Sequence, residues 1–325
     1  MKKYVKHILT ALACYLLILV CNFALPRLLP GDPVAYLTGF EEEEMSAEIY
    51  EYYYHALHLD QNVFMQFGYY IKDIFNGTLG YSFKSEAVVS TLIFEKIGYS
   101  LQITLPAILL SIAIGLVWGL HAGYKKDGVF DKISTTSMLV LNAMPTFMIA
   151  LLLVIALCFE SKLFPYAGLS SGDAQNAAQF FADRLYHLVL PIACVTLASL
   201  PSKYMLVRNT SAQFCNDKSV TYAKQRGLST ARIEYAYVFK NVAQPFVTMV
   251  GSAIGSCIAG SVVVENVFSI NGVGTLLTNA VNTLDYPLVQ GILFVTTTIM
   301  IICLVLSDLA CMAISPKARR KGESV

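Results

Sequence analysis

The chain has 325 residues, of which 56% are hydrophobic and only 14% charged, and its formal net charge is +1. Because a soluble globular domain carries about 25% charged residues, this composition excludes an ordinary soluble enzyme or binding domain and indicates a membrane protein. With a net charge near zero, the placement of Lys and Arg along the chain is more informative than their sum.

Six stretches are apolar and long enough to cross a membrane, which takes roughly 20 residues for about 30 Å of hydrocarbon. They cover residues 8–29, 100–123, 134–158, 185–206, 246–265 and 288–313. The first follows three lysines, as a signal peptide does. Its only small-x-small site, Ala11 to Ala13, comes too early for cleavage, and apolar residues continue to Leu29, so we predict a retained span.

Residues 30–99 form a long acidic segment, with eleven Asp or Glu against three Lys. Aromatic residues are interleaved with the charges, so part of the segment should fold on the membrane surface. The run from Glu41 to Glu44 is either a solvated charge cluster or a docking site for a protein with a basic rim. His55 and His58 have the spacing of metal ligands but lack a third ligand, so we predict no metal site.

Glycines and prolines punctuate the spans. Gly115, Gly119 and Gly123 give two successive GxxxG spacings, which favour close packing against another helix. Four prolines are expected to kink the spans that contain them: Pro106, Pro145, Pro191 and Pro201.

A basic segment, TYAKQRGLSTARIEYAYVFKNVAQP, occupies residues 221–245 between two spans. Basic and apolar positions recur at helical spacing on both sides of Gly227, which is free to adopt positive φ. We predict two short amphipathic helices joined by a bend. Such a pair either docks onto a soluble partner or lies on anionic lipid headgroups.

Lys and Arg predict the orientation. With the N-terminus inside, seventeen of the 23 Lys and Arg are cytoplasmic, and the outer loop 266–287 has none. We therefore expect both termini and the 221–245 segment to be cytoplasmic.

The fifth span is rich in small residues, which either permit close helix packing or border a path for solute. We favour a translocation path lined by Ser252, Gly255, Ser256, Gly260 and Glu265. For Glu265, contact with substrate and hydrogen bonding to the turn between Ser269 and Gly274 are both open.

Catalytic and cofactor motifs are missing from the sequence. There is no GxxxxGK[ST] phosphate loop and no HExxH, and the five histidines are scattered. Six of the eight cysteines fall inside spans and none in residues 30–99, which argues against a disulfide framework. We predict a non-enzymatic chain that binds no metal or cofactor directly.

Several motifs, in order, carry a family resemblance. Gly227 followed by Asn241 and Pro245 ahead of a span resembles the coupling loop of ABC importer permeases. Further stretches resemble the dipeptide, oligopeptide and nickel subfamily, first-permease type. They are PGDP at 30–33, LDQ at 59–61, GTLGYSF at 77–83, VENVFSINGVGTLL at 264–277 and LDYPLVQG at 284–291. The chain departs from the family at Gln225, where alanine is common, at Asn271, where proline is common, and at Ser315-Pro316-Lys317.

The resemblance implies partners and contacts. The partners are a second, similar permease, two ATP-binding subunits that use ATP and Mg, and an extracytoplasmic solute-binding protein; surrounding lipid is expected and nucleic acid is not. The implied ATPase-coupling residues are Ala223, Gly227, Tyr235, Tyr237, Phe239, Asn241 and Pro245.

The expected fold is an all-α membrane protein with six transmembrane helices and type I ABC importer permease architecture, in a bacterial plasma (inner) membrane. Residues 1–99 hold the first helix and the acidic extracytoplasmic segment, 100–313 a five-helix core with coupling loop 207–245, and 314–325 a cytoplasmic tail. The expected cargo is short peptides. Nickel or a metal chelate is the alternative, and an ion-coupled secondary transporter is a distant one, since the spans show no inverted repeat.

Overall fold

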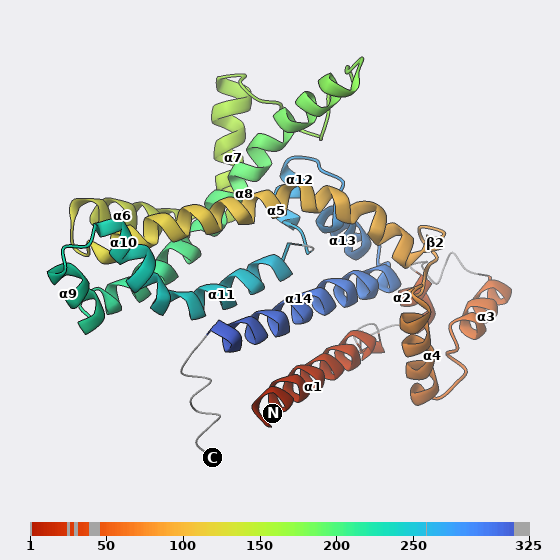
Figure 1. The fold of residues 1–325 in the computed structure, drawn as a ribbon. Helices are drawn as coiled ribbons and strands as arrows, with labels where there is room; N and C mark the ends of the chain where they lie inside the picture. The colour runs from red at the N-terminus through yellow and green to blue at the C-terminus, as the bar shows by residue number, and fades with distance from the viewer. Residues whose placement is uncertain (1, 25–26, 29–31, 39–45, 258, 315–325) are drawn as a thin grey trace. The chain divides into compact units, whose positions relative to one another are not determined.

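The computed structural model describes residues 2–24, 27–28, 32–38, 46–257 and 259–314. The Glu41 to Glu44 run, the first half of the PGDP motif and the tail from residue 315 lie outside this part of the chain. Within it the regular secondary structure is helical, apart from a two-residue antiparallel pairing of β1 (Tyr81–Ser82) with β2 (Ala87–Val88). Figure 1 gives the element labels.

The chain divides into two compact units. Unit 1 contains the residues up to Ser100, Ile258–Asn266 and Asn271–Ile301, and unit 2 contains Leu101–Cys257, Val267–Ile270 and the residues from Ile302 onward. One division falls after Ser100, one residue beyond the predicted domain boundary between residues 99 and 100, and the predicted domain division stays a prediction. Unit 1 also includes residues 271–301, because they pack against the start of α5. These residues belong to the five-helix core, 100–313, that is predicted from the sequence.

Three of the described helices are long and apolar enough to cross a membrane. They are α5 (Val89–Tyr124), α8 (Ala177–Phe214) and the Tyr286–Cys311 part of α14 (Tyr286–Ile314). A fourth is added if the bent pair of α6 and α7 counts as one span, and α1 (Lys2–Ala24) contributes a shorter apolar stretch, Leu12–Ala24. The helical, multi-pass membrane class is therefore supported, while the count of six stays a prediction.

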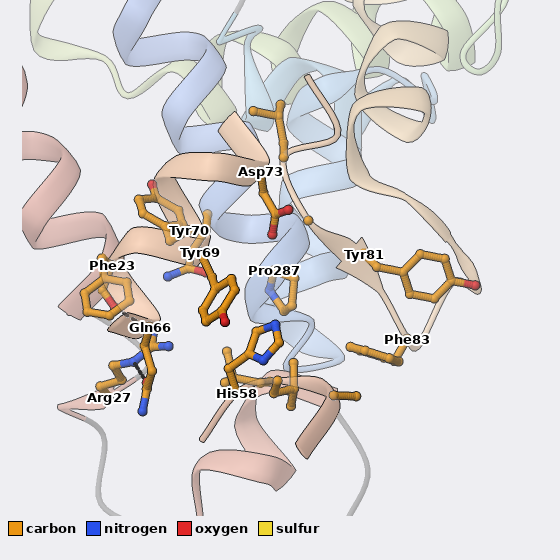
Figure 2. Close-up of a pocket in the computed structure, with 16 residues that line it drawn as sticks. Phe23, Arg27, His58, Gln66, Tyr69, Tyr70, Asp73, Tyr81, Phe83 and Pro287 are labelled. Atoms are coloured by element: carbon orange, nitrogen blue, oxygen red, sulfur yellow. Dashed lines mark hydrogen bonds between the residues drawn. The ribbon is translucent and has the colours of Figure 1, made fainter. Parts of the chain in front are cut away.

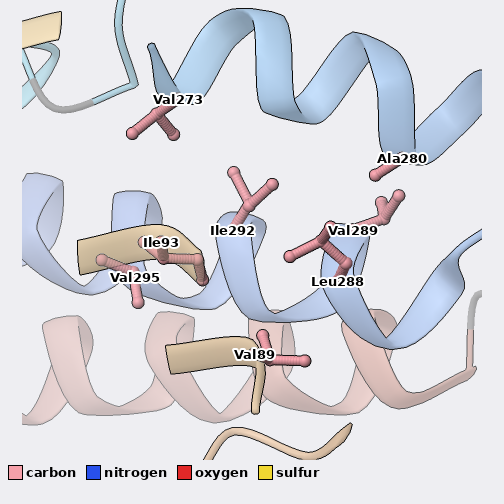
Figure 3. Packing of buried hydrophobic residues seen from close by; sticks show 8 residues of the cluster. All are labelled: Val89, Ile93, Val273, Ala280, Leu288, Val289, Ile292 and Val295. Carbon is pink, nitrogen blue, oxygen red and sulfur yellow. The ribbon is translucent and has the colours of Figure 1, made fainter. Parts of the chain in front are cut away.

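Unit 1 is built on helices from both ends of the chain. Its apolar core joins Val89 and Ile93 of α5 to Val273 and Ala280 of α13 (Val273–Asn282), as Figure 3 shows. The start of α14 completes this core with Leu288, Val289, Ile292 and Val295. The N-terminal helix α1 lies along α14, where the Tyr15 and Thr298 hydroxyls are 3.0 Å apart (Figure 1).

The described part of the acidic segment is folded into ordered elements of unit 1, and its place on the membrane surface stays a prediction. These elements are α2 (Pro33–Thr38), α3 (Ala47–Ala56), α4 (Val63–Asn76) and the β1–β2 hairpin. Ser46 and Asn62 cap the N-termini of α3 and α4 by accepting hydrogen bonds from backbone N–H groups three residues later. Gly77 ends α4 in the left-handed conformation, with φ +76°.

Unit 2 is organised around α8, against which α6 (Val129–Ala143), α7 (Thr146–Val154) and α11 (Phe239–Gly255) pack. The glycines of α5 confirm the predicted close packing, because all three lie against α8. A Cβ on Gly119 would lie 2.9 Å from the carbonyl oxygen of Tyr204, and one on Gly123 would lie 2.4 Å from that of Arg208. Only glycine permits so close an approach of the two backbones.

The predicted span 134–158 is not one straight helix. Helices α6 and α7 meet at 100°, with Met144 extended at ψ 125° and Pro145 as the first residue beyond the break. The residue before a proline is disfavoured in the helical region, so the helix ends there. By contrast, Pro106, Pro191 and Pro201 lie inside α5 and α8, which continue through them.

The predicted span 246–265 is also wrong as a single helix. Helix α11 ends at Gly255, and a separate short helix, α12 (Val262–Val267), follows after Gly260, whose φ is +69°. At its other end α11 begins earlier than predicted. The chain is helical from Thr230 onward, through α10 (Thr230–Ile233) and the π-helical turn η4 (Glu234–Val238). The second short helix predicted for the basic segment is therefore the start of a longer one.

Candidate coupling surface and membrane site

The basic segment forms an elbow, defined here as α9 (Lys218–Gln225), the turn at Gly227, α10 and η4. The turn has a Schellman arrangement. The Leu228 N–H donates to the Ala223 carbonyl (3.3 Å) and the Gly227 N–H donates to the Lys224 carbonyl (3.0 Å). This pattern requires a left-handed residue, and Gly227 supplies it with φ +69°. The predicted bend is confirmed at the predicted residue.

One side of the elbow is buried in unit 2. Val220, Ala223, Ile233 and Val238 join an apolar cluster that also contains Leu120, Val207, Val242 and Phe246. Ala223 is only 1% exposed, so its methyl group packs inside its own chain instead of forming the predicted outer contact. The elbow is thereby fixed to the helices that contribute to this cluster.

The other side of the elbow is aromatic and basic. Tyr222 is 63% exposed and Tyr235 46% exposed, and Lys224, Arg226 and Arg232 are exposed beside them. The remaining predicted coupling residues face inward in part. Tyr237 and Phe239 pack against the buried cluster, Asn241 donates from Nδ2 to the Tyr237 carbonyl at 3.4 Å, and Pro245 lies inside α11. Tyr222 is not among the coupling residues predicted from the sequence, although its position on the polar face of α9 indicates that it is exposed.

A buried acid ties η4 to α5. Glu234 is 4% exposed, and its Oε1 lies 3.1 Å from Nδ1 of His121. Nearby, the Lys224 ammonium lies 5.0 Å from the centre of the Tyr124 ring, a cation–π distance. Neither contact was predicted. The available signal was an acidic residue in an otherwise basic segment.

The residues predicted to line a translocation path are divided between the units. Ser252, Gly255 and Ser256 belong to unit 2, whereas Gly260 and Glu265 belong to unit 1. Gly255 is buried, and the Ser256 hydroxyl donates to the Ala253 carbonyl at 2.8 Å. Their neighbour Gly251 packs directly on Ser307, since a Cβ there would lie 2.3 Å from the Ser307 Cβ. This contact is close helix packing, one of the two roles that the sequence leaves open for the small residues of the fifth span.

Glu265 is fully buried and bonded on both carboxylate oxygens. Its Oε1 accepts from the Ser100 hydroxyl at 2.7 Å, and its Oε2 accepts from the N–H groups of Gly274 (2.8 Å) and Thr275 (3.1 Å). The sequence leaves two roles open for Glu265, contact with substrate and hydrogen bonding to the turn between Ser269 and Gly274. The observed contacts are those of the second role. Gly260 and Gly272 make room for the carboxylate, because a Cβ on either would lie 2.4 to 2.5 Å from its oxygens.

Two of the family-like motifs meet in unit 1. The Ser82 hydroxyl of GTLGYSF donates to Oδ2 of Asp285 in LDYPLVQG at 2.5 Å, and both side chains are buried. Asp285 also accepts from the N–H of Leu288 through Oδ1, which caps the start of α14. The hydrogen bond links the β1–β2 hairpin to α14.

Comparison with known proteins defines the class. Residues 111–320, which include the elbow and α11, match the family of binding-protein-dependent transport system inner membrane components. Because this match covers more than half of the chain, the protein belongs to that family of membrane permeases.

Particular relatives cover nearly the whole chain. The chain is 26% identical to the dipeptide transport system permease protein DppB of Escherichia coli (strain K12), over 94% of each protein. It is 28% identical to the dipeptide permease DppB of Bacillus subtilis (strain 168), over 98% of each. It is also 28% identical to the di/tripeptide permease DppB of Pseudomonas aeruginosa (strain UCBPP-PA14), over 92% of this chain and 93% of that protein.

Proposed function

We propose that this chain is the transmembrane permease subunit of an ATP-binding-cassette importer that takes up short peptides. The observation that carries the proposal is the near end-to-end similarity to permeases named for dipeptide and di/tripeptide transport. Family membership and the multi-pass helical structure support a transport subunit rather than an enzyme.

Energy for uptake would come from other polypeptides. The sequence contains no GxxxxGK[ST] phosphate loop, so ATP and Mg would be bound by two separate ATPase subunits. A second, similar permease would complete the membrane part, and an extracytoplasmic solute-binding protein would deliver the peptide. The orientation predicted from Lys and Arg, with both termini cytoplasmic, puts the elbow on the ATPase side.

The elbow has the properties of a coupling element. Exposed Tyr222 and Tyr235 resemble the aromatic anchors that dominate protein interfaces. The buried side of the elbow is packed on α5, α8 and α11, so a displacement at the anchors would be transmitted to these helices. A packed connection between two sites is one of the physical networks that can carry such coupling.

Reconstitution into liposomes tests the proposal. The permease pair, the ATPase subunits and the binding protein should accumulate radiolabelled dialanine when ATP is supplied, and an ATPase subunit lacking its phosphate-loop lysine should abolish uptake. Uptake that continues without ATP and follows an ion gradient would overturn the proposal. ATP-dependent uptake of ⁶³Ni²⁺ but not of dialanine would identify nickel as the substrate, and the protein would still be the permease of an ATP-driven importer.

A further inference from the structure

A pocket in unit 1 has no lining residue in common with the elbow or with the predicted translocation path. It has a volume of about 320 Å³ and is bordered by the end of α1, by α3 and α4, by the β1–β2 hairpin and by the start of α14. Ligand pockets typically measure about 300 to 1,000 Å³, so this one suits a small molecule. Figure 2 shows the side chains that face it.

Arg27 supplies a positive charge that is held in place. Its Nε donates to Oε1 of Gln66 at 3.0 Å and its Nη1 donates to the Phe23 carbonyl at 3.1 Å, while the guanidinium carbon lies 3.8 Å from the centre of the Phe23 ring. A guanidinium has five N–H donors, so donors remain for a ligand. No carboxylate among the described residues forms an ion pair with Arg27.

Asp73 supplies a negative charge from another wall of the pocket. It stands on α4, is half-buried, and has no ion-pair partner in the part of the chain that the structure describes. Burial raises the pKa of its carboxyl, and the nearby charges of His58 and Lys72 only partly offset this effect. A cation brought into the pocket would stabilise the carboxylate.

Both charges are anchored on α4, Arg27 through its hydrogen bond to Gln66 and Asp73 directly. Gln66, which holds Arg27, and Asp73 are seven residues apart on α4, so their backbones lie on the order of 10 Å apart on one face. An extended dipeptide spans about 7 Å, and hydrogen bonds at its ends add about 3 Å each. An extended chain of five residues is about 17 Å long, well beyond the roughly 10 Å between these two positions on α4.

Aromatic side chains line the space between the charges. The His58 and Tyr69 rings stack with centroids 3.8 Å apart, and Phe83 points toward them from the other side of the pocket (Figure 2). His58 holds this position with φ +55°, a conformation that few non-glycine residues adopt and that recurs at binding sites. Such walls suit apolar or aromatic side chains of varied shape.

We propose that this pocket binds a short peptide as a zwitterion, with the C-terminal carboxylate on Arg27 and the N-terminal ammonium on Asp73. The inference rests on the proposed function and deepens it, since it assigns a peptide site to the permease itself. A lipid headgroup that carries an anion and an ammonium offers similar chemistry, so the test must separate the two sources.

The test measures binding of Ala-Phe by calorimetry to the assembled transporter without its binding protein, in phosphatidylglycerol nanodiscs. Wild type should bind, and Arg27→Gln and Asp73→Asn should each weaken binding by about 10- to 100-fold, the range for a charge-assisted hydrogen bond. Lys72→Gln, a neighbouring charge on α4, is the matched control and should bind as wild type does. Arg27→Lys keeps the positive charge but loses the paired N–H donors of the guanidinium, so its affinity for Ala-Phe should lie between those of wild type and Arg27→Gln. The melting temperature of each variant checks that it is folded.

Blocked peptides assign each end. N-acetylation should weaken binding to wild type but not weaken it further in Asp73→Asn, and C-terminal amidation should behave likewise in Arg27→Gln, as groups in direct contact do in a mutant cycle. Equal binding of free and blocked peptides, or an equal loss in Lys72→Gln, would overturn the assignment. So would occupancy by phosphatidylethanolamine with no binding of Ala-Phe.

Transport separates failure of this inference from failure of the proposed function. If wild type accumulates dialanine with ATP while Arg27→Gln and Asp73→Asn do so equally well and bind Ala-Phe normally, the pocket assignment is wrong and the importer stands. If wild type fails to accumulate peptide, the proposed function is wrong as well.

Discussion

Replacing Gly227 with valine should damage coupling without disturbing membrane insertion. The glycine closes the Schellman turn with φ +69°, and a Cβ built there meets no other atom within 4 Å. The cost is therefore one of backbone conformation and not of crowding. The left-handed region costs an L-residue about 1–2 kcal/mol, and a β-branched side chain lies at the upper end of that range.

A graded series isolates this backbone effect. Gly227→Asn is the matched control, because asparagine tolerates positive φ, and it should couple nearly as wild type does. Gly227→Ala should lose about 1 kcal/mol of elbow stability and Gly227→Val about 2 kcal/mol, which corresponds to a roughly 5- to 30-fold smaller ratio of formed to unformed elbow. Peptide uptake per ATP hydrolysed in proteoliposomes should fall in the order Asn, Ala, Val.

Insertion and folding should stay intact across the series, because the buried cluster beneath the elbow is untouched. Yield in the membrane fraction and the melting temperature of the purified complex measure this. A valine variant with wild-type uptake and wild-type ATP use would refute the assignment of the turn to coupling, and so would an asparagine variant as defective as valine.

Three further predictions follow from packing and charge. Gly123→Ala should destabilise the protein by about 1–3 kcal/mol, because the added methyl group forces α5 and α8 apart. Gly98→Ala is the control on the same helix, has open space around its Cβ, and should not have this effect. Thermal unfolding in detergent compares the two variants. Glu265→Ala should leave buried donors without an acceptor, at about 1–3 kcal/mol each, and hydrogen exchange at the following turn should accelerate. Peptide affinity should fall as the pH is lowered toward the raised pKa of the Asp73 carboxyl, since protonation removes its charge while the peptide ammonium keeps its charge. Calorimetry at several pH values, with His58→Asn to remove the imidazole, checks this.

Local features of the fold could be predicted because they depend on neighbouring residues. The Gly115, Gly119 and Gly123 spacing predicts a packing face, and this face is found against α8. Gly227 between two amphipathic stretches predicts a bend, and the Schellman turn is found there. In each case the residue type and its spacing determine the conformation.

Breaks within apolar runs could not be predicted by hydropathy. No charged residue interrupts the sequence at Met144–Pro145 or at residues 256–261, so each run resembles one span, although the helix ends inside it. A proline within a span is ambiguous too, since Pro191 lies in an unbroken helix and Pro145 does not.

The pocket depends on tertiary structure. Arg27, His58, Asp73 and Pro287 come from distant parts of the sequence, and only the packing of α1, α4 and α14 in unit 1 brings them together. Single-residue patterns gave no sign of it, and His58 appeared as one of two isolated histidines.

The backbone contact between α5 and α8 restricts how unit 2 can rearrange. With carbonyl oxygens of α8 set against Gly119 and Gly123, neither helix can slide along the other without first lifting away, so the two should travel as one body while substrate access alternates. The backbone rotations needed for that alternation should then occur where the helices are interrupted, at Met144–Pro145 and beyond Gly255. Spin labels on α5 and α8 should accordingly report one constant separation at every stage of ATP turnover.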